Sequence, residues 1–434
     1  MAALLDIETS AGSRQAQSAK EPSAAEGIVP AAAFLTPENA HEAPLAPSHD
    51  NPRSVTILGA TGSIGCSTID LIERDPDSYR VEALVANRNV NKLVKQALSV
   101  RPRVAVVADQ TQFEALRDAL AGTGIEVAAG QDAVIEAAQR PSDWVMSGIV
   151  GAAGLAPTLE AVRRGAMVAL ANKEALICSG ELMRAEVHKA GARLLPVDSE
   201  HNAIYQVWEE HRRESISKII LTASGGPFRQ TSLADMAKVT PAQAVKHPNW
   251  SMGAKISIDS ATMMNKGLEY IEAFYLFGLP QEQISILVHP QSIIHSMVEY
   301  QDGSVLAQLG TPDMRTPISY TLAWPGRMKS PSERLDLAAI STLTFENPDE
   351  ERFPAIRLTR EALRTGGLAP TIMNAANEIA VAAFLGERIG FLDIPKTVEE
   401  VLQKFNNRQL ASLEDVFEAD ATGRRLATEI VGEV

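Results

Sequence analysis

Cysteine and long apolar runs are both scarce in this 434-residue chain. Cys66 and Cys178 are its only cysteines, too few for a disulfide framework or a cysteine-based zinc cluster, so we expect a reducing, cytoplasmic compartment. No apolar run approaches the roughly 18 residues of a membrane-spanning helix. The sequence therefore predicts a protein without disulfides and without a membrane partner.

Basic residues are also in deficit, with 40 Lys and Arg against 54 Asp and Glu and a formal net charge of −14. Nucleic acids and anionic membranes need a basic face, so neither is expected as the main partner. A local basic pocket for a phosphorylated small molecule remains compatible with this balance. The length predicts two or three domains.

Residues 1–52 are rich in Ala, Ser, Pro and Glu, and Arg14 and Lys20 are their only strong bases. They lack the basic start and apolar core of a secretory signal, and they carry too many acids for a transit peptide. Such a composition buries too little apolar surface to offset chain entropy. We therefore expect residues 1–52 to form a disordered extension.

Residues 53–197 alternate short apolar runs with amphipathic helical patterns. This alternation is typical of parallel βαβ units and predicts an α/β protein with an N-terminal doubly wound, Rossmann-like domain. The expected strands are 54–58, 81–86, 104–108, 125–128, 144–149, 167–170 and 194–197.

The rest of the chain is less regular. It predicts a central α+β catalytic domain with an open sheet at 198–323, a linker at 324–350 and a small helical C-terminal domain at 351–434. Residues 301–303 fit a hairpin turn. The expected strands are 218–223, 256–258, 284–288, 295–300 and 304–309.

Three glycines, Gly59, Gly62 and Gly65, lie between the first strand and the first helix. Glycines there permit a tight turn and let backbone N–H groups approach a pyrophosphate at the helix N-terminus. A strand-to-helix turn without a ligand would have the same pattern.

The second strand ends in Asn87-Arg88-Asn89, without the acid that usually binds the ribose 2′-hydroxyl of NAD. An arginine between two amides suits a 2′-phosphate, so NADPH is the expected cofactor. The alternative is that Arg88 is a solvated loop charge.

Asp198 and Glu200 follow an apolar run, two residues apart. In extended backbone, side chains at i and i+2 point the same way, so both carboxylates could hold one hard cation such as Mg²⁺ or Mn²⁺. The alternative is that Asp198 or Ser199 caps the next helix and Glu200 lies in its first turn.

Asn265 and Glu269 are four residues apart and share a helix face, with Lys266 beside them. The apolar stretch 271–277 indicates a largely buried helix, where unpaired charges are costly. This group therefore favours a site that also contains the acids at 198 and 200, over an Asn–Glu pair on a solvated helix.

Two loops also favour ligand contacts. Residues 246–253 include His247 and Trp250 and end in Gly253, a composition that suits a lid over a ligand. Residues 224–227 close a strand with a small hydroxyl and bare backbone, which suits a phosphate. Either loop could instead be purely structural.

With these motifs the chain resembles the 1-deoxy-D-xylulose 5-phosphate reductoisomerase family, from about Ser54 to the C-terminus. The strings at the metal and lid positions are long and specific, unlike the glycine loop. The resembling strings are Gly59-Ala-Thr-Gly-Ser-Ile-Gly65, Ala171-Asn-Lys-Glu174, Pro196-Val-Asp-Ser-Glu-His-Asn202, Thr222-Ala-Ser-Gly-Gly-Pro-Phe-Arg229, His247-Pro-Asn-Trp-Ser-Met-Gly253, residues 260–272, His289-Pro-Gln-Ser292, residues 310–317 and Asn374-Ala-Ala-Asn-Glu378.

The resemblance implies a site for NADPH, a divalent metal (Mg²⁺, Mn²⁺ or Co²⁺) and a phosphorylated substrate. The implied metal ligands are Asp198, Glu200 and Glu269. The implied catalytic residues are Lys173, Glu200, His247 and Lys266. The implied cofactor contacts are Thr61, Gly62, Ser63, Ile64, Asn87, Arg88, Asn89, Asn172, Glu174 and Gly253. The implied substrate contacts are Lys173, Ser199, Glu200, Ser224, His247, Trp250, Ser260, Asn265, Lys266 and Glu269.

The implied reaction is the NADPH-dependent, metal-assisted isomerisation and reduction of 1-deoxy-D-xylulose 5-phosphate to 2-C-methyl-D-erythritol 4-phosphate, in the non-mevalonate isoprenoid pathway. In the family the metal acts as a Lewis acid on the ketone and the adjacent hydroxyl, and NADPH delivers hydride after the carbon skeleton has rearranged. The resemblance also implies a homodimer.

Two other functions fit parts of the sequence. A semialdehyde dehydrogenase also opens with a glycine loop, but its chemistry needs a nucleophilic cysteine, which neither cysteine context favours. A non-catalytic NADP-binding sensor would have no reason to keep three convergent acids and a lysine. A requirement for divalent metal would separate the enzyme from the sensor.

Overall fold

The computed structural model describes residues 44–246, 250 and 252–432. Its contacts divide the chain into residues 1–30 and 31–434, and every described element belongs to the second unit. Among the described helices, none combines the length and the apolar character that a membrane span requires. The predicted lid residue His247 and residues 1–43 of the predicted extension lie outside the described residues.

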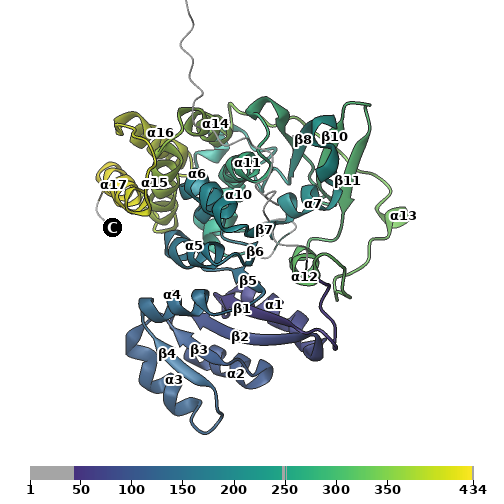
Figure 1. Ribbon diagram of the computed structural model, residues 1–434. Helices are drawn as coiled ribbons and strands as arrows, with labels where there is room; N and C mark the ends of the chain where they lie inside the picture. Colours follow the sequence, from purple (N-terminus) through teal and green to yellow (C-terminus); the bar gives the residue numbers. More distant parts are fainter. Residues whose placement is uncertain (1–43, 247–249, 251, 433–434) are drawn as a thin grey trace, which may run out of the picture. The chain divides into compact units, whose positions relative to one another are not determined.

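Seven parallel strands form the first sheet, in the order β4-β3-β2-β1-β5-β6-β7 (Figure 1). The strand order reverses at β1, which pairs with β2 on one side and β5 on the other. Doubly wound sheets bind ligands at such a switch point, and the predicted doubly wound fold is confirmed. The strands are β1 (Arg53–Leu58), β2 (Tyr79–Ala86), β3 (Val104–Val107), β4 (Glu126–Ala129), β5 (Trp144–Ser147), β6 (Met167–Leu170) and β7 (Arg193–Pro196).

Helices cover both faces of this sheet because most of its strands are apolar on both sides. Val134, Leu159 and Leu176 pack against one face, from α4, α5 and α6. Ile69 and Leu93 pack against the other face, from α1 and α2, together with α3 and α12. These helices are α1 (Ser63–Glu73), α2 (Val90–Val100), α3 (Phe113–Ala119), α4 (Gln131–Gln139), α5 (Leu155–Arg163), α6 (Lys173–Ala190) and α12 (Arg315–Ala323).

Helix α12 joins the first sheet although it comes much later in the chain. Its Ile318 lies in the same apolar core as α1, and the indole N–H of Trp144 on β5 donates to the carbonyl of Thr321 at 3.0 Å. The buried guanidinium of Arg53 on β1 donates to the carbonyl of Leu322 at 2.7 Å. The end of the predicted 198–323 domain therefore packs on the strands of the predicted 53–197 domain.

The second sheet has four strands in the order β11-β10-β8-β9. β8 and β9 are parallel, while β10 is antiparallel to both β8 and β11. The predicted turn at 301–303 joins β10 to β11, and Val288 at the end of β9 pairs with Glu346 from the predicted linker. The strands are β8 (Ile216–Ala223), β9 (Ile284–Val288), β10 (Ile294–Tyr300) and β11 (Val305–Leu309).

The predicted strand at 256–258 is wrong, because these residues belong to helix α10 (Ala254–Ala261). The apolar run there is too short to distinguish a strand from a buried helical turn. A helical signal does exist in its neighbours: Lys255 and Asp259 are four residues apart, and their charged groups pair at 2.8 Å.

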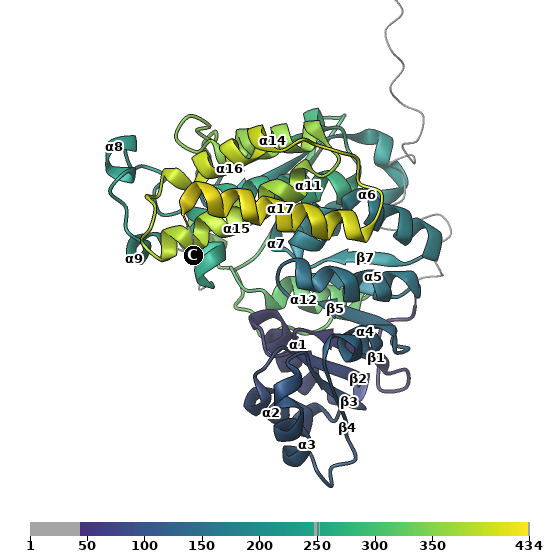
Figure 2. The same ribbon diagram turned by 90° about the vertical axis from the view of Figure 1, so that its left-hand side faces the viewer.

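The C-terminal region is helical, as expected. Figure 2 shows α15, α16 and α17 packed side by side, with α14 beside them. Ile372, Val398 and Val416 fill their shared core, and α15 also contacts α6 while α14 contacts α11. The remaining helices are α7 (Ser199–Val207), α8 (Leu233–Met236), α9 (Pro241–Ala244), α11 (Met264–Phe277), α13 (Leu337–Ile340), α14 (Ala355–Thr365), α15 (Ala369–Leu385), α16 (Asp393–Lys404) and α17 (Leu413–Val431).

Candidate active site

The glycine loop lies at the switch point of the first sheet and requires glycine at two positions. Gly59 has φ +88°, and a Cβ on it would lie 2.5 Å from the carbonyl oxygen of Gly148, just after β5. A Cβ on Gly65 would lie 2.4 Å from the carbonyl oxygen of Gly59, so helix α1 could not pack as closely. Gly62 and Ser63 are exposed at the start of α1. The N–H of Gly62 donates to the carbonyl of Gly59 at 3.0 Å within the turn, whereas the N–H of Ser63 lies in the first turn of α1, where backbone donors can bind an anion such as a pyrophosphate.

The other predicted cofactor residues of this sheet edge follow β2. Asn87, Arg88 and Asn89 are all exposed. The Asn89 side chain accepts a hydrogen bond from the N–H of Lys92 at 3.1 Å and so caps α2. Arg88 extends from the same turn, one strand away from the glycine loop.

Two further predicted cofactor residues anchor the start of α6. Asn172 is buried; its amide donates to the carbonyl of Gly151 at 3.0 Å, and its side-chain oxygen caps the helix by accepting from the N–H of Ala175. The buried Glu174 carboxylate pairs with the Lys255 ammonium at 3.4 Å. These contacts fix the helical turn that carries Lys173. The predicted residue Gly253 is exposed at the N-cap of α10.

The three predicted metal ligands converge from two helices. Each offers a carboxylate oxygen, and these oxygens lie within 4.8 Å of one another. The extended geometry expected for Asp198 and Glu200 is wrong, because β7 ends at Pro196, and the alternative of a helix cap is confirmed. Asp198 is instead the N-cap of α7, accepting from the N–H of Ser199 at 3.1 Å, and Glu200 lies in the first turn. Helix α11 supplies Glu269.

Two largely buried lysines lie among these acids. The Lys173 ammonium lies 2.7 Å from Asp198 and 3.4 Å from Glu269, and the Lys266 ammonium lies 2.9 Å from Glu200 and also pairs with Glu269. Burial by itself lowers the pKa of each lysine, but the carboxylates outweigh it and raise both values. Both lysines therefore stay charged.

The acids respond unequally to this environment. Burial, and after it the charge of Glu200, raises the pKa of Glu269 to about 7. Burial opposes ionisation of Asp198, but the Lys173 ammonium outweighs it and lowers the pKa to about 2. Lys266 lowers the pKa of Glu200 in the same way. Three carboxylates against two ammonium groups offer a divalent cation hard oxygen ligands and net negative charge, so the residues present fit Mg²⁺ or Mn²⁺.

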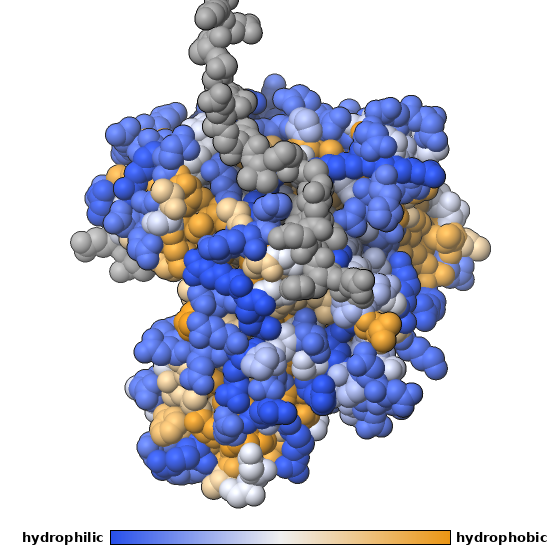
Figure 3. Space-filling view, in the orientation of Figure 1, coloured by the Kyte–Doolittle hydropathy of each residue, from blue (hydrophilic) through white to orange (hydrophobic). Residues whose placement is uncertain are grey.

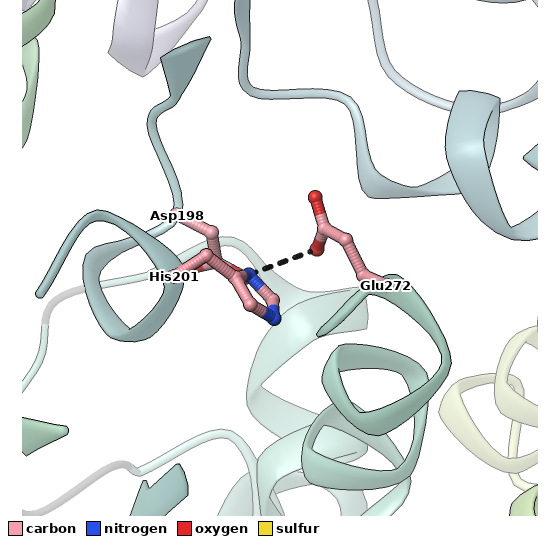
Figure 4. A group of neighbouring side chains, drawn as sticks. All are labelled: Asp198, His201 and Glu272. Atoms are coloured by element: carbon pink, nitrogen blue, oxygen red, sulfur yellow. Dashed lines mark ion pairs between the residues drawn. The ribbon is translucent and has the colours of Figure 1, made fainter. Parts of the chain in front are cut away.

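A second group of possible ligands shares Asp198 (Figure 4). His201 Nδ1 lies 3.7 Å from Asp198 Oδ2 and 3.2 Å from Glu272 Oε2. Burial lowers the pKa of His201 to about 4, and burial followed by the charge of Asp198 raises that of Glu272 well above its usual value. Neither His201 nor Glu272 is accessible, at 0% and 1% exposure, whereas Asp198 and Glu200 are partly exposed. A metal that also binds a substrate therefore fits the Asp198–Glu200–Glu269 group better.

His201 and Glu272 were not predicted as site residues. A signal for them exists in the spacing, since His201 follows Asp198 by three residues and Glu272 follows Glu269 by three. On a helix this spacing puts both pairs on shared faces. His295, which lies beside the predicted lid residue Trp250, was also missed.

Close backbone packing brings the turn that carries one predicted phosphate residue, Ser224, against the helix end that carries another, Ser260. Gly226 has φ +67°, and a Cβ on it would lie 2.6 Å from the carbonyl oxygen of Ser260 at the end of α10. Ser224 belongs to the same tight turn and accepts from the N–H of Gly226 at 3.2 Å. Asn265 and Lys266 follow at the start of α11. The turn that carries Ser224 thus packs where α10 meets α11, while the Asn265 side-chain oxygen accepts from the Lys173 ammonium at 2.8 Å.

Trp250, in the described part of the predicted lid, lies beside His295, which interacts with Glu200 and Lys266 of the site. The Trp250 and His295 rings have centroids 6.2 Å apart. His295 is buried on β10, and burial lowers its pKa, while the charges of Glu200 and Lys266 act on it as well. The predicted substrate residue Ser199 is buried and donates to Glu200 at 2.5 Å.

Three family models match this chain in succession. Residues 55–180 match "1-deoxy-D-xylulose 5-phosphate reductoisomerase". Residues 194–277 match "1-deoxy-D-xylulose 5-phosphate reductoisomerase C-terminal domain", and residues 309–426 match "DXP reductoisomerase C-terminal domain".

Individual relatives are similar in sequence to this chain over most of its length. The 1-deoxy-D-xylulose 5-phosphate reductoisomerase of Rhodospirillum centenum is 63% identical over 382 residues, which cover 88% of this chain and 95% of the relative. That of Zymomonas mobilis is 59% identical over 380 residues, covering 88% and 98%.

Two solved structures of reductoisomerases with this name are also similar to this chain. The Zymomonas mobilis enzyme in complex with NADPH has a TM-score of 0.84 and 57% identity, covering 88% of this chain and 99% of the other. A DOX-P reductoisomerase in complex with NADPH, fosmidomycin and magnesium has a TM-score of 0.83 and 43% identity, covering 87% and 98%. With this identity, coverage and site geometry, the chain belongs to the 1-deoxy-D-xylulose 5-phosphate reductoisomerase family.

Proposed function

We propose that this chain catalyses the NADPH-dependent, divalent-metal-assisted isomerisation and reduction of 1-deoxy-D-xylulose 5-phosphate to 2-C-methyl-D-erythritol 4-phosphate. The observation that carries the proposal is the convergence of three carboxylate oxygens within 4.8 Å, beside two largely buried lysines. This arrangement lies at the carboxyl edge of a sheet whose switch point holds the glycine loop.

Asp198, Glu200 and Glu269 would hold the metal. When bound, a divalent metal supplies Lewis-acid polarisation of the substrate's ketone and hydroxyl oxygens. Lys173 and Lys266 now pair with carboxylates that a metal would use. We propose that metal binding leaves both ammonium groups available to the substrate, with Lys173 and Glu200 holding or moving protons at the reacting carbons.

The phosphate end of the substrate would bind at the helix junction. We propose that Ser224, Ser260, Asn265 and Lys266 contact it, since they offer hydroxyl and N–H donors and a positive charge. Trp250 and His247 would cover the substrate and exclude water, which protects a reactive aldehyde.

NADPH would bind along the carboxyl edge of the first sheet. The start of α1, with Thr61, Gly62, Ser63 and Ile64, would receive the pyrophosphate, and residues 87–89 the 2′-phosphate. Bound NADPH supplies the hydride. Asn172, Glu174 and Gly253 would complete the site from α6 and α10.

A dehydrogenase with a nucleophilic cysteine finds no support in the described residues. Burial raises the pKa of the Cys178 thiol well above its usual value. The Cys66 sulfur lies 3.6 Å from the carbonyl oxygen of Ala60, inside the turn that opens α1.

The substitution Glu269→Gln tests the proposed metal site. It should weaken Mn²⁺ binding by about 100-fold or more, because it removes a charged ligand, and it should lower turnover while NADPH binding stays nearly intact. The exposed Glu282→Gln variant is a matched control that should behave as the unmodified protein. Parallel loss of metal and NADPH binding in Glu269→Gln would contradict the ligand assignment.

We also propose that the active protein is a homodimer, which the sequence resemblance implied. β11 is an edge strand with Val305, Leu306 and Leu309 exposed at 47%, 42% and 36%, and Figure 3 shows apolar surface near β11 and α13 at the right of the view. Exposed apolar edge strands favour association. In sedimentation velocity, Leu306→Glu should shift a dimer to monomer; an unchanged dimer would exclude this face.

A cytoplasmic location is the last part of the proposal. Both cysteines are free in the structure, which suits a reducing compartment. Fractionation of host cells should recover the activity with cytoplasmic marker enzymes, and recovery from an oxidising compartment would contradict it.

A further inference from the structure

One buried histidine joins the two helices that carry the proposed metal ligands. His201 on α7 is fully buried, and its Nε2 lies 2.9 Å from the carbonyl oxygen of Glu269 on α11. A carbonyl oxygen only accepts, so Nε2 must carry a hydrogen and donate it. The ring therefore ties α7, with Asp198 and Glu200, to the backbone of the third ligand.

The other ring nitrogen, Nδ1, lies between two carboxylates, 3.2 Å from Glu272 Oε2 and 3.7 Å from Asp198 Oδ2. Asp198 Oδ2 already pairs with the Lys173 ammonium at 2.7 Å, whereas His201 Nδ1 and Glu272 Oε2 have no hydrogen-bond partner among the described residues and face each other (Figure 4). Two lone pairs at this separation repel, and a buried polar atom without a partner costs stability. One proton must therefore lie between these two atoms, whichever of them carries it.

We propose that Glu272 is a positioning residue of the metal site. By pairing with Nδ1 at 3.2 Å, it fixes the orientation of the His201 ring, so that Nε2 points at the Glu269 carbonyl. The ring then sets the spacing between α7 and α11, and with it the distances among the three carboxylates. This inference rests on the proposed metal site at Asp198, Glu200 and Glu269.

Loss of the Glu272 contact should change the affinity for the metal even when substrate and NADPH are absent. Partners that orient ligands change metal affinity about 10- to 100-fold when they are removed. Glu272→Leu leaves Nδ1 buried with no partner, and the ring is then free to turn away from Glu269. Glu272→Gln keeps the size of the side chain and provides an N–H that can donate to Nδ1.

Mn²⁺ binding to the purified full-length protein, followed by the electron paramagnetic resonance signal of free Mn²⁺, tests this directly. Glu272→Leu should weaken binding about 10-fold or more, while Glu272→Gln should stay within about threefold of the unmodified protein. Tyr270→Phe is the matched control, because it removes a hydroxyl bond to Gln281 from the same helix and should leave Mn²⁺ binding unchanged. If Gln weakens binding as much as Leu, Glu272 acts as a ligand and the inference is overturned.

A double-substitution cycle tests whether Glu272 acts through His201. His201→Phe alone should weaken Mn²⁺ binding, and adding Glu272→Leu to it should cause no further loss, because groups that act as a unit are not additive. Additive losses would overturn the inference while leaving the proposed function intact. An unmodified protein that binds no Mn²⁺ would overturn the metal site itself and this inference with it.

Discussion

Lys173 and Lys266 show why single residues at this site depend on each other. Both are largely buried, at 11% and 4% side-chain exposure, and each lies within 3 Å of a carboxylate. A charge buried this deeply is tolerated only with a partner of opposite sign. The same acids therefore hold the lysines in place and offer the cation site, so the two roles cannot be separated by one substitution.

Substitution of Arg88 should change the preference of the protein for NADPH over NADH. Arg88→Ala should weaken NADPH binding about tenfold, the usual worth of a hydrogen bond to a charged group, and should leave NADH binding nearly unchanged. Fluorescence titration with both nucleotides measures this, with the exposed Lys95→Ala on α2 as control. An equal loss of both nucleotides would mean that Arg88 does not read the 2′-phosphate.

The sequence predicted which residues form the metal-ligand group better than it predicted the backbone structure that positions them. Asp198, Glu200 and Glu269 were singled out, and the structure brings their carboxylates together, but through a helix cap instead of an extended strand. His201 and Glu272 were missed because each looks like an ordinary buried polar residue until the two helices are placed. Only the packing of α7 on α11 reveals that they face each other.

At the scale of elements, the turn after β8 depends on glycine for two separate reasons. Gly226 adopts a left-handed conformation, and a Cβ there would also meet the backbone of Ser260. Backbone cannot move aside as a flexible side chain can, so the turn and α10 would have to separate. That separation would displace Ser224 from Ser260.

Gly226→Ala should therefore raise the KM for the phosphorylated substrate about tenfold or more, since small misplacements of binding groups are costly. Gly303→Ala is the matched control, because Gly303 has φ +86° but nothing within 4 Å of an added Cβ. It should lower the melting temperature without changing KM. Steady-state kinetics and thermal unfolding of both variants measure the difference, and equal KM values would contradict the packing role.

Strands of the first sheet were predictable because burial on both faces makes them apolar and β-branched. Each expected strand from 54–58 to 194–197 overlaps an observed one. The run at 256–258 failed because three residues cannot reveal a period, and its burial comes from tertiary contacts of α10. The spacing of apolar residues predicts a helix or strand well only where the apolar pattern spans more residues than one repeat of that element.

At the scale of the molecule, distant segments meet at the site. Lys255 and Asp259 on α10 connect Glu174 on α6 to Asn377 on α15, whose amide donates to Asp259 at 2.8 Å. The C-terminal helices thus support the helices that carry Lys173 and Ser260. The sequence predicted a helical C-terminal region, but it could not predict these contacts, because a buried polar network is defined by partners far apart in the chain. The domain boundaries remain predictions.

The most direct test of the account is the absorbance of NADPH during incubation of the purified protein with 1-deoxy-D-xylulose 5-phosphate and Mg²⁺, with and without EDTA. We expect NADPH to be oxidised only when substrate and metal are both present, and EDTA to stop the reaction until Mg²⁺ is restored in excess. Oxidation that continues unchanged in EDTA would contradict the role of the three carboxylates. No oxidation by folded protein with Mg²⁺ present would contradict the proposed reaction.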